Sequence, residues 1–331
     1  MVEYAQTLNY VSAIGTAIME EMRRDERVVA WGQDLVSMRG TFGDAPGMID
    51  EFGGDRIIDT PIIEQAIAQM AVGAALAGSR PIAYIATAGF LSVCFDTLFM
   101  KMGAMRQEFS YKGPMPLVIF CRAGVGGGFG ADHCTSTEAL FMHTPGLKIV
   151  MPSTPYDAKG LMKAAIRDDD PVLFIASGPL YFGTKQFVPV EDYIIPLGQA
   201  DIKREGTDIT IVAWSGMIPK ALNAAEILSK DNINAEVVDL RTIVPMDIEA
   251  VVKSAKKTGR LLIAHDAMKR GGAAAEIAMK INEVAPDVVA NLKTPIRRLA
   301  AKNLGLPRNR ELEAELVPQI PDVIQIVKEM V

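Results

Sequence analysis

Between residues 59 and 78 the chain reads DTPIIEQAIAQMAVGAALAG, a proline turn followed by an almost wholly apolar run with one acidic residue, Glu64. Pro61 restricts Thr60 to an extended conformation and is tolerated in a first helical turn, so we expect Glu64 about one turn into a helix. Residues that are small or apolar all round are typical of a buried helix. Glu64 therefore lies either at the helix mouth, where the helix dipole favours a carboxylate, or in the interior, where its charge needs a partner.

Around this run the chain alternates helices with apolar strands, in two successive blocks. In the first block we expect strands over residues 28–31, 57–58, 82–86, 116–122, 147–151 and 172–176, and helices over 8–24, 68–78, 90–108 and 155–167. In the second we expect strands over 208–214, 235–240, 260–265 and 295–299, and helices over 218–229, 248–256, 271–285 and 322–331. This alternation is typical of parallel sheets covered on both faces, so the predicted fold class is α/β with two doubly wound domains.

A segment with prolines, scattered charges and no periodicity separates the two blocks. We therefore predict a first domain over residues 1–185, a linker over 186–205 and a smaller second domain over 206–331.

The composition excludes several classes of protein. With 49% hydrophobic and 22% charged residues the chain is ordinary globular material, and a net charge of −6 without a basic stripe argues against nucleic-acid binding. The cysteines, Cys94, Cys121 and Cys134, form no CxxC pair, which argues against a zinc site or a disulfide framework. No signal-peptide pattern and no membrane-spanning apolar run stand out, so we expect a cytoplasmic protein.

A glycine-rich run, Gly124–Gly130, follows the strand predicted over residues 116–122. Open parallel sheets bind ligands at such strand ends. The run fits a dinucleotide fingerprint only loosely, because the next strand ends in Pro152-Ser153 with no acidic residue to bind a ribose. We interpret it as a loop whose missing side chains let its backbone approach a ligand or a partner chain closely.

His133 follows the glycine run directly. A histidine beyond a strand end is a candidate proton donor or oxyanion stabiliser, and the alternative is a histidine hydrogen-bonded within its loop. Cys134 makes a poor candidate nucleophile, because adjacent side chains rarely face each other. His143 is expected to end a helix, and His265 suits a structural and a functional role equally.

Several segments, taken together, resemble one family. They are Asp59-Thr60-Pro61 with Glu64, Pro145–Lys148 running into Met151–Leu161, Ala165–Asp168, and Asp239-Leu240-Arg241-Thr242. The chain is similar, over nearly its whole length, to the β subunits of the thiamine-diphosphate-dependent 2-oxo acid dehydrogenases, which include the acetoin dehydrogenases and are related to transketolase. The resemblance implies a pyrimidine-binding domain followed by a transketolase C-terminal-type domain. It thins near the carboxyl terminus, where Lys302–Leu306 replaces an acidic, proline-containing segment.

The resemblance implies roles for three side chains. Glu64 matches the glutamate that hydrogen-bonds a ring nitrogen of the cofactor's aminopyrimidine and favours its reactive tautomer. Phe90 matches the aromatic residue that packs on the pyrimidine ring. His133 matches the histidine that faces the substrate and assists acyl transfer to the lipoyl group.

The resemblance also implies a metal ion. The three consecutive acids of Asp168–Asp170 cannot all face one divalent ion, but the backbone carbonyls of such a turn suit a monovalent cation. The family positions whose backbone oxygens bind a structural potassium ion are matched by Leu117, Ala165, Ile166, Asp168 and Asp170.

The chain lacks the Gly-Asp-Gly sequence, followed by a distant Asn, that anchors magnesium and diphosphate in thiamine enzymes. It is therefore expected to hold half of an active site. By the resemblance, an α subunit brings the magnesium and the diphosphate in an α2β2 heterotetramer, and a lipoyl-bearing acyltransferase accepts the acyl unit.

Some positions depart from the family pattern and bear on the substrate. Gln33 stands where an acidic residue relays protons between two cofactors, Phe120 replaces a common arginine, and Tyr84 stands at a usual glutamate. Val93–Asp96 and Arg167–Pro171 look more like the acetoin branch than the pyruvate branch. The expected reaction is therefore cleavage of acetoin or a 2-oxo acid, with transfer of the acyl unit to lipoamide.

Two alternatives stay open. The first is ketol transfer between sugars, as in transketolase, which needs basic contacts such as Arg122 or Lys185 in the cleft. The second is a non-catalytic subunit that docks its partner onto an acyltransferase core.

Overall fold

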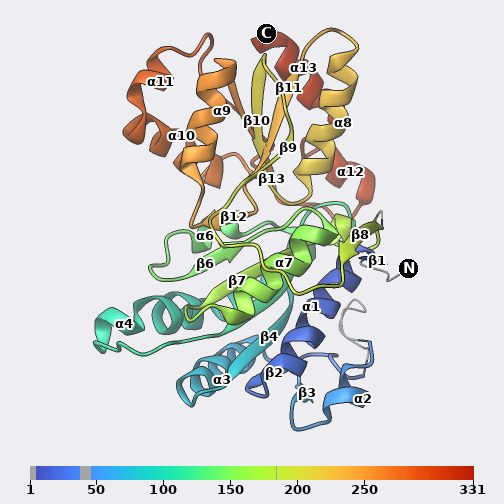
Figure 1. The fold of residues 1–331 in the computed structure, drawn as a ribbon, viewed down its shortest axis with the longest axis vertical. Helices are drawn as coiled ribbons and strands as arrows, with labels where there is room; N and C mark the ends of the chain where they lie inside the picture. The colour runs from blue at the N-terminus through green and yellow to red at the C-terminus, as the bar shows by residue number, and fades with distance from the viewer. Residues whose placement is uncertain (1–4, 38–45, 184) are drawn as a thin grey trace.

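The computed structural model describes residues 5–37, 46–183 and 185–331, which build two large sheets with their helices, one above the other in Figure 1, and a small two-stranded sheet. The amino-terminal half forms the lower part and the carboxyl-terminal half the upper part. Residues 1–4, 38–45 and 184, all within the predicted first domain, lie outside the described structure. No helix of the described residues is long and apolar enough to cross a bilayer.

The first sheet has seven strands in the order β12-β6-β7-β5-β4-β2-β3, and only the pair β12–β6 is antiparallel. Its strands are β2 (Val28–Gly32), β3 (Ile57–Asp59), β4 (Arg80–Thr87), β5 (Val118–Ala123), β6 (Lys148–Val150), β7 (Val172–Ser177) and β12 (Thr242–Val244). Side chains along each strand alternate between two buried clusters, so both faces of the sheet are covered, as the continuous apolar strands predict.

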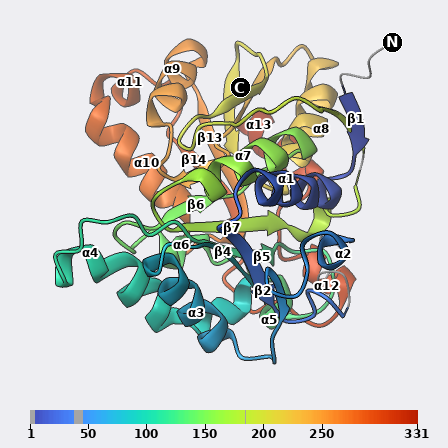
Figure 2. The same cartoon turned by 60° about the horizontal axis from the view of Figure 1, so that its bottom comes forward.

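One face of this sheet is covered by α1 (Tyr10–Arg24) and α7 (Pro155–Arg167), which lie side by side in Figure 2. Both helices begin at a residue that caps them: the Asn9 side chain accepts from the Ser12 amide, and Thr154 accepts from the Asp157 amide. Pro155 stands in the first turn of α7, where its missing N–H costs nothing.

The opposite face is covered by α3 (Glu64–Leu76) and by the segment that follows β4. That segment consists of a 3-10 turn, η1 (Ala88–Ser92), a π-helical stretch, η2 (Thr97–Ala104), and the short α4 (Met105–Glu108). The remaining short helices of this half are α2 (Met48–Phe52), α5 (Ala131–Cys134), α6 (Glu138–Phe141) and the 3-10 turn η3 (Gly178–Leu180).

The second sheet has five strands in the order β14-β13-β10-β11-β9, with β9 antiparallel at one edge. The strands are β9 (Asp201–Arg204), β10 (Ile209–Ala213), β11 (Ala235–Asp239), β13 (Leu261–Met268) and β14 (Arg297–Ala301). The helices are α8 (Met217–Ser229), α9 (Ile248–Thr258), α10 (Ala273–Val284), α11 (Pro286–Ala290), α12 (Arg310–Ala314) and α13 (Ile320–Met330). The prediction of two doubly wound α/β units is confirmed.

The two halves share structure at their junction. β12, which comes from the second half, extends the first sheet along β6, and the apolar cluster beneath that sheet continues into β10, β11 and α9. The segment predicted as a linker, 186–205, is not irregular throughout: β8 (Gln186–Pro189) pairs with β1 (Ala5–Leu8), and β9 joins the second sheet. The division into domains at these residues stays a prediction.

Two predicted elements differ from the structure. The helix expected over residues 90–108 is divided into η1, η2 and α4, and the Gly103 backbone in η2 packs so closely on Thr144 that a Cβ there would lie 2.5 Å from its methyl group. A wider π turn is one way for a helix to accommodate such a close contact. Glu64 is the first residue of α3 and not one turn inside it, because Ile63 at the N-cap is not helical.

Candidate functional site

Glu64 lies at the carboxyl-terminal edge of the first sheet, where β3 leads into α3. The turn before it is fixed by hydrogen bonds: the Asp59 carboxylate accepts from the Val36 amide (2.6 Å) and the Ser37 amide (3.0 Å), and the Thr60 amide donates to the Gly32 carbonyl (3.0 Å). No side chain caps α3. The half-buried Glu64 carboxylate is the acidic group in the first turn of this helix.

The segment that carries Phe90 packs against α3. The Gln65 side chain donates to Thr97 Oγ1 (3.2 Å), and Cys94 lies one turn after Phe90. Burial raises the pKa of the Cys94 thiol to about 12, and the negative charge of Glu64 raises it further. Glu64 therefore lies near enough to this segment for its charge to be felt there.

His133 belongs to the four-residue helix α5, directly beside Phe90. The two rings meet edge to face with their centroids 5.2 Å apart. The backbone of α5 is held against β4 and η1, because Thr87 Oγ1 donates to the Asp132 carbonyl (2.9 Å) and Gly89 packs so closely that a Cβ there would lie 2.2 Å from the same oxygen. A side chain at position 89 would push α5 and His133 away.

Asp132 is the charged neighbour of His133. Its Oδ2 lies 3.1 Å from His133 Nδ1 and accepts a hydrogen bond from Arg308 (2.9 Å). The His133 ring, and then the Arg308 charge, hold the pKa of the Asp132 carboxyl below its ordinary value, so Asp132 is ionised at neutral pH.

The sequence reasoning singled out three residues here, and the structure places them as follows. Phe90 and His133 are in contact, whereas Glu64 begins α3, which is joined to the segment after β4 by the Gln65–Thr97 hydrogen bond. It missed Asp132 as a partner of His133, and it missed Phe129, whose ring centroid lies 6.4 Å from that of His133. Asp132 precedes His133 in sequence, which is the only signal that pointed to it.

Three of the five carbonyls expected to bind potassium, those of Leu117, Ile166 and Asp168, accept hydrogen bonds from the chain itself. Arg80 Nη1 donates to the Ile166 carbonyl (3.0 Å), in the last turn of α7, and to the Asp168 carbonyl (3.1 Å), at the C-cap of that helix. The Leu117 carbonyl accepts from the Val172 amide. The ammonium group of Lys148 lies 2.7 Å from the Asp168 carboxylate and 3.1 Å from that of Asp170. An ion bound to all five carbonyls would share two of them with a guanidinium group, so this set does not fit a potassium ion well.

The other histidines and the cysteines lie apart from this site. His143 is exposed just after α6, as expected of a helix end. His265 is buried in β13 with its ring stacked on Trp214, and burial lowers its pKa to about 4. All three cysteines are buried thiols, and burial raises the pKa of Cys134, which makes a poor nucleophile of it.

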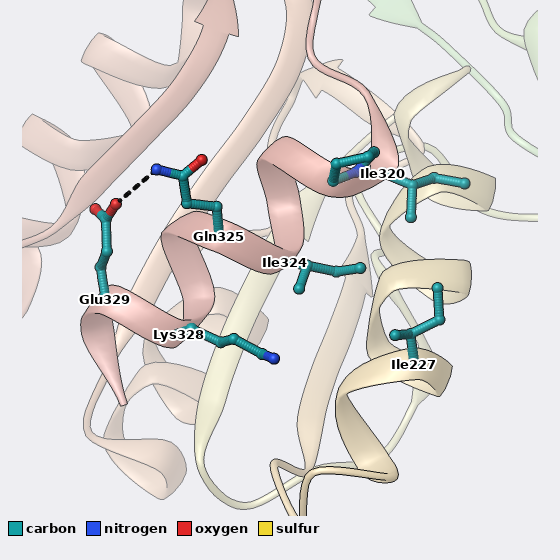
Figure 3. Close-up of a pocket in the computed structure, with 7 residues that line it drawn as sticks. Ile227, Ile320, Ile324, Gln325, Lys328 and Glu329 are labelled. Atoms are coloured by element: carbon teal, nitrogen blue, oxygen red, sulfur yellow. Dashed lines mark hydrogen bonds between the residues drawn. The ribbon is translucent and has the colours of Figure 1, made fainter.

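Two hollows of the surface bear on function. One, of about 300 Å³, lies behind the glycine loop and includes Arg122, Cys134 and Arg310 in its lining. The other, of about 750 Å³, lies between α8 and α13, far from His133 in sequence and in fold, and Figure 3 shows Ile227, Ile320 and Ile324 facing it, with Lys328 and Glu329 at its rim. None of Glu64, Phe90 and His133 lines this hollow.

Comparison with known families agrees with the two-part fold. Residues 6–182 match the pyrimidine binding domain of transketolase, and residues 198–323 match the transketolase C-terminal domain.

Individual proteins are similar to the chain over nearly its whole length. The 2-oxoisovalerate dehydrogenase subunit beta of Bacillus subtilis is 44% identical over 90% of each chain, and the pyruvate dehydrogenase E1 component subunit beta of the same species is 39% identical over 98% of each. The acetoin:2,6-dichlorophenolindophenol oxidoreductase subunit beta of Cupriavidus necator is 40% identical over 96% of each.

Among solved structures, a split gene transketolase described as an inactive beta4 tetramer superposes with a TM-score of 0.80 at 22% identity, over 98% of each chain, and shares the fold. The paired domain matches and the relatives agree with the residues that first suggested this family. The chain belongs to the transketolase-like family of thiamine-diphosphate enzymes, in the group formed by the β subunits of the 2-oxo acid and acetoin dehydrogenases.

Proposed function

We propose that this chain is the β subunit of a thiamine-diphosphate-dependent dehydrogenase that cleaves acetoin or a 2-oxo acid and transfers the acyl unit to a lipoyl group. The observation that carries the proposal is the half-buried Glu64 carboxylate at the start of α3, beside the segment whose Phe90 contacts His133. The relatives support it, because their names are those of dehydrogenase β subunits acting on 2-oxoisovalerate, pyruvate and acetoin.

The residues of the site fit an aminopyrimidine ring. Such a ring is flat and has polar atoms at its rim, so it needs an apolar surface and a few polar groups. Phe90 supplies the apolar surface, and Glu64 supplies a carboxylate that hydrogen-bonds a protonated ring nitrogen. Thr60 Oγ1 is buried without a hydrogen-bond partner among the described residues, which is the state of a group that awaits a ligand.

Thiamine diphosphate, when bound, supplies an electron sink for cleaving a carbon–carbon bond next to a carbonyl group. The Glu64 carboxylate holds a proton at the ring nitrogen. It thereby favours the tautomer of the aminopyrimidine that can itself accept a proton from a neighbouring group. Glu64 stands in the first turn of α3, where the helix dipole favours a negative charge.

His133 is proposed to act on the acyl transfer. Asp132 Oδ2, 3.1 Å from Nδ1, favours a proton on that nitrogen, so Nε2 is the atom that gives or takes a proton at the substrate. With a 2-oxo acid, carbon dioxide leaves and the acyl carbon is oxidised, while the lipoyl disulfide is reduced: one sulfur takes the acyl group and the other takes a proton. With acetoin, acetaldehyde leaves in place of carbon dioxide.

A partner chain is part of the proposal. Among the described residues no group of three or more His, Cys, Asp or Glu side chains is placed to hold a metal ion, and we propose that an α subunit supplies the magnesium and diphosphate site. Around Glu64 the surface is apolar and exposed at Ile62, Ile63 and Val93, which suits contact with another chain. A lipoyl-bearing acyltransferase is the proposed acyl acceptor.

The sugar alternative is less well supported. Arg122 does line a hollow near the His133 loop, as an anionic acceptor would require, but the relatives of 39–44% identity are dehydrogenase subunits. An assay with a sugar-phosphate acceptor separates the two reactions.

The experiment that tests the proposal replaces the Glu64 carboxylate in the reconstituted α/β enzyme. With acetoin, pyruvate and 2-oxoisovalerate as substrates, Glu64→Gln is expected to lower turnover by about a hundredfold or more, the usual scale for a proton-transfer group. Glu249→Gln is the matched control, because Glu249 also lies in a first helical turn, that of α9, and is exposed. Near-normal turnover of Glu64→Gln would contradict the role in proton transfer.

A second measurement addresses the half-site. Calorimetric titration of thiamine diphosphate with magnesium is expected to show binding to the chain paired with an α-type subunit and none to the chain alone. Tight binding to the lone chain would place the diphosphate site within these 331 residues and overturn the division of the site.

A further inference from the structure

The glycine loop between β5 and α5 is bound by a residue from near the carboxyl terminus. The Gly126 amide donates to Glu313 Oε1 (2.9 Å), and the Gly128 amide donates to Glu313 Oε2 (2.5 Å). Gly124, Gly126, Gly128 and Gly130 all have positive φ, which turns successive amides toward one side of the loop. The glycine loop, which the sequence led us to interpret as the approach site of a ligand or a partner chain, therefore binds a carboxylate of its own chain.

Glu313 is fully buried on α12, and a buried carboxylate is stable only where donors replace water. The Gly126 and Gly128 amides are its backbone donors. Asn309 begins α12 and accepts from the Leu312 amide (2.9 Å), which fixes the helix that aims Glu313 at the loop. Burial raises the pKa of the Cys134 thiol, and the Glu313 carboxylate adds to the rise, so its charge reaches the residue next to His133.

The contact extends over the loop as far as His133. A Cβ at Gly128 would lie 2.9 Å from the Arg310 amide nitrogen, and one at Gly130 would lie 2.8 Å from Arg308 Cγ. Arg308 also donates to Asp132, the partner of His133. Figure 2 shows α12 beside α5, although 176 positions separate Asp132 from Arg308 in the sequence.

We propose that Glu313 is a positioning residue that holds the glycine loop in the conformation presenting His133 to the substrate. The argument rests on the proposed function, because it takes His133 as the group that acts on acyl transfer. Through Glu313 and Arg308 the second half of the chain reaches into the site of the first, so His133 is oriented by a segment that provides no group to the chemistry itself.

The test uses the assembled α/β enzyme with Glu313→Gln. A glutamine amide has one acceptor oxygen in place of two and turns an N–H₂ toward the second glycine amide, so one loop hydrogen bond is lost. Hydrogen exchange in peptides covering residues 124–134 is expected to quicken about tenfold. Acyl transfer to lipoamide is expected to fall about tenfold, while reduction of the dye dichlorophenolindophenol, which bypasses the lipoyl group, stays within about twofold.

Glu311→Gln is the control, because Glu311 lies on the same helix and is exposed, and none of the three readouts should change. Gly128→Ala reaches the same contact from the loop side, at a φ of +73°, and should reproduce the effects if Glu313→Gln assembles poorly. A merely structural role of Glu313 would lower dye reduction and acyl transfer together.

Unchanged exchange of the loop in both variants would overturn the proposal. Faster exchange with normal acyl transfer would overturn it too, provided that His133→Ala abolishes the transfer. If His133→Ala itself leaves acyl transfer normal, the proposed role of His133 fails, and the exchange data then show separately whether Glu313 holds the loop.

Discussion

Two buried glutamates of this chain show how differently a carboxyl can be accommodated. Glu313 is met by two backbone amides, whereas neither Oε atom of Glu138, at the start of α6, has a hydrogen-bond partner among the described residues. Burial, and then the nearby Asp266 carboxylate, raise the pKa of Glu138 to about 8. Glu138 is therefore protonated in the native state at neutral pH.

This shift predicts how stability depends on pH. A native pKa of about 8, against 4.5 for an ordinary glutamate, means that the folded chain keeps a proton that the unfolded chain loses. The contribution of Glu138 to the free energy of unfolding is thus fully present below pH 4.5 and is lost as the pH rises toward 8. Glu138→Gln should remove this part of the slope and stabilise the protein at pH 8 by a few kcal/mol, as measured by urea unfolding at pH 5.5, 7 and 8.5.

Asp239 and Asp266 also have raised pKa values and contribute to the same slope, so the difference between the wild-type chain and Glu138→Gln is the informative quantity. The exposed Glu283→Gln serves as the control. Parallel pH dependences of Glu138→Gln and the wild type would show that Glu138 is ionised in the native state.

At the scale of single residues the sequence predicted the site in part. Glu64 and His133 were singled out from their local sequence and Phe90 from the family resemblance, and the contact of Phe90 with His133 agrees with their assignment to one site. Glu313 was not found, because its partners lie far away in the sequence and the segment before it departs from the family pattern. Pairing over such distances leaves no local signal in one sequence.

At the scale of elements, the carboxyl end of α7 is stabilised by the chain's own cations. The last carbonyls of a helix lack intrahelical partners, and here Arg80 donates to those of Ile166 and Asp168. We propose that Arg80 takes the place that the family resemblance gives to potassium.

The prediction concerns the ion dependence of stability. The melting temperature of the wild-type chain should be the same in potassium chloride and in N-methylglucamine chloride of equal concentration. Arg80→Gln should lose about 2 kcal/mol of stability and should then gain some of it back in potassium, because the freed carbonyls accept the ion. Arg27→Gln, which removes an exposed partner of Asp25, is the control. A lower melting temperature of the wild-type chain in the absence of potassium would contradict this proposal and support a potassium site.

Most helices and strands were predicted correctly from periodicity, since continuous apolar strands and amphipathic helices such as α1 and α7 carry strong local patterns. The segment from residue 88 to 108 was wrong as one helix. Its apolar residues fit a continuous helix, and their pattern contains no information on the widened turn that packs Gly103 on Thr144.

At the scale of the whole molecule, the two halves are joined by buried charges. Asp157 of α7 accepts from Arg241 Nη2 (2.6 Å) and from Lys203 (2.5 Å), and Ser153 donates to the buried Asp239. Segments that first suggested the family, around residues 151–161 and 239–242, thus meet in this contact between the halves. We attribute the presence of both segments in the family pattern to this packing contact and not to catalysis.

Asp157→Asn tests how strongly this contact joins the halves. It leaves the buried Arg241 and Lys203 with the half-exposed Asp201 as their close counter-charge, which is expected to cost about 3 kcal/mol, since breaking a buried ion pair from one side is expensive. Urea unfolding followed by circular dichroism should remain a single transition at a lower midpoint, and the exposed Asp55→Asn should match the wild type. A loss below about 1 kcal/mol would show that the apolar contacts alone join the halves.

The strand β12 has a consequence for how the protein is made. Residues 242–244 complete the edge of the first sheet at β6, and Glu313 binds the loop before His133. The ribosome releases these residues long after the amino-terminal strands. Until then the β6 edge of the first sheet is uncovered, and an uncovered sheet edge is prone to aggregation. Newly made chains should therefore depend on chaperones until translation is nearly complete, and the catalytic loop should be the last part of the subunit to mature.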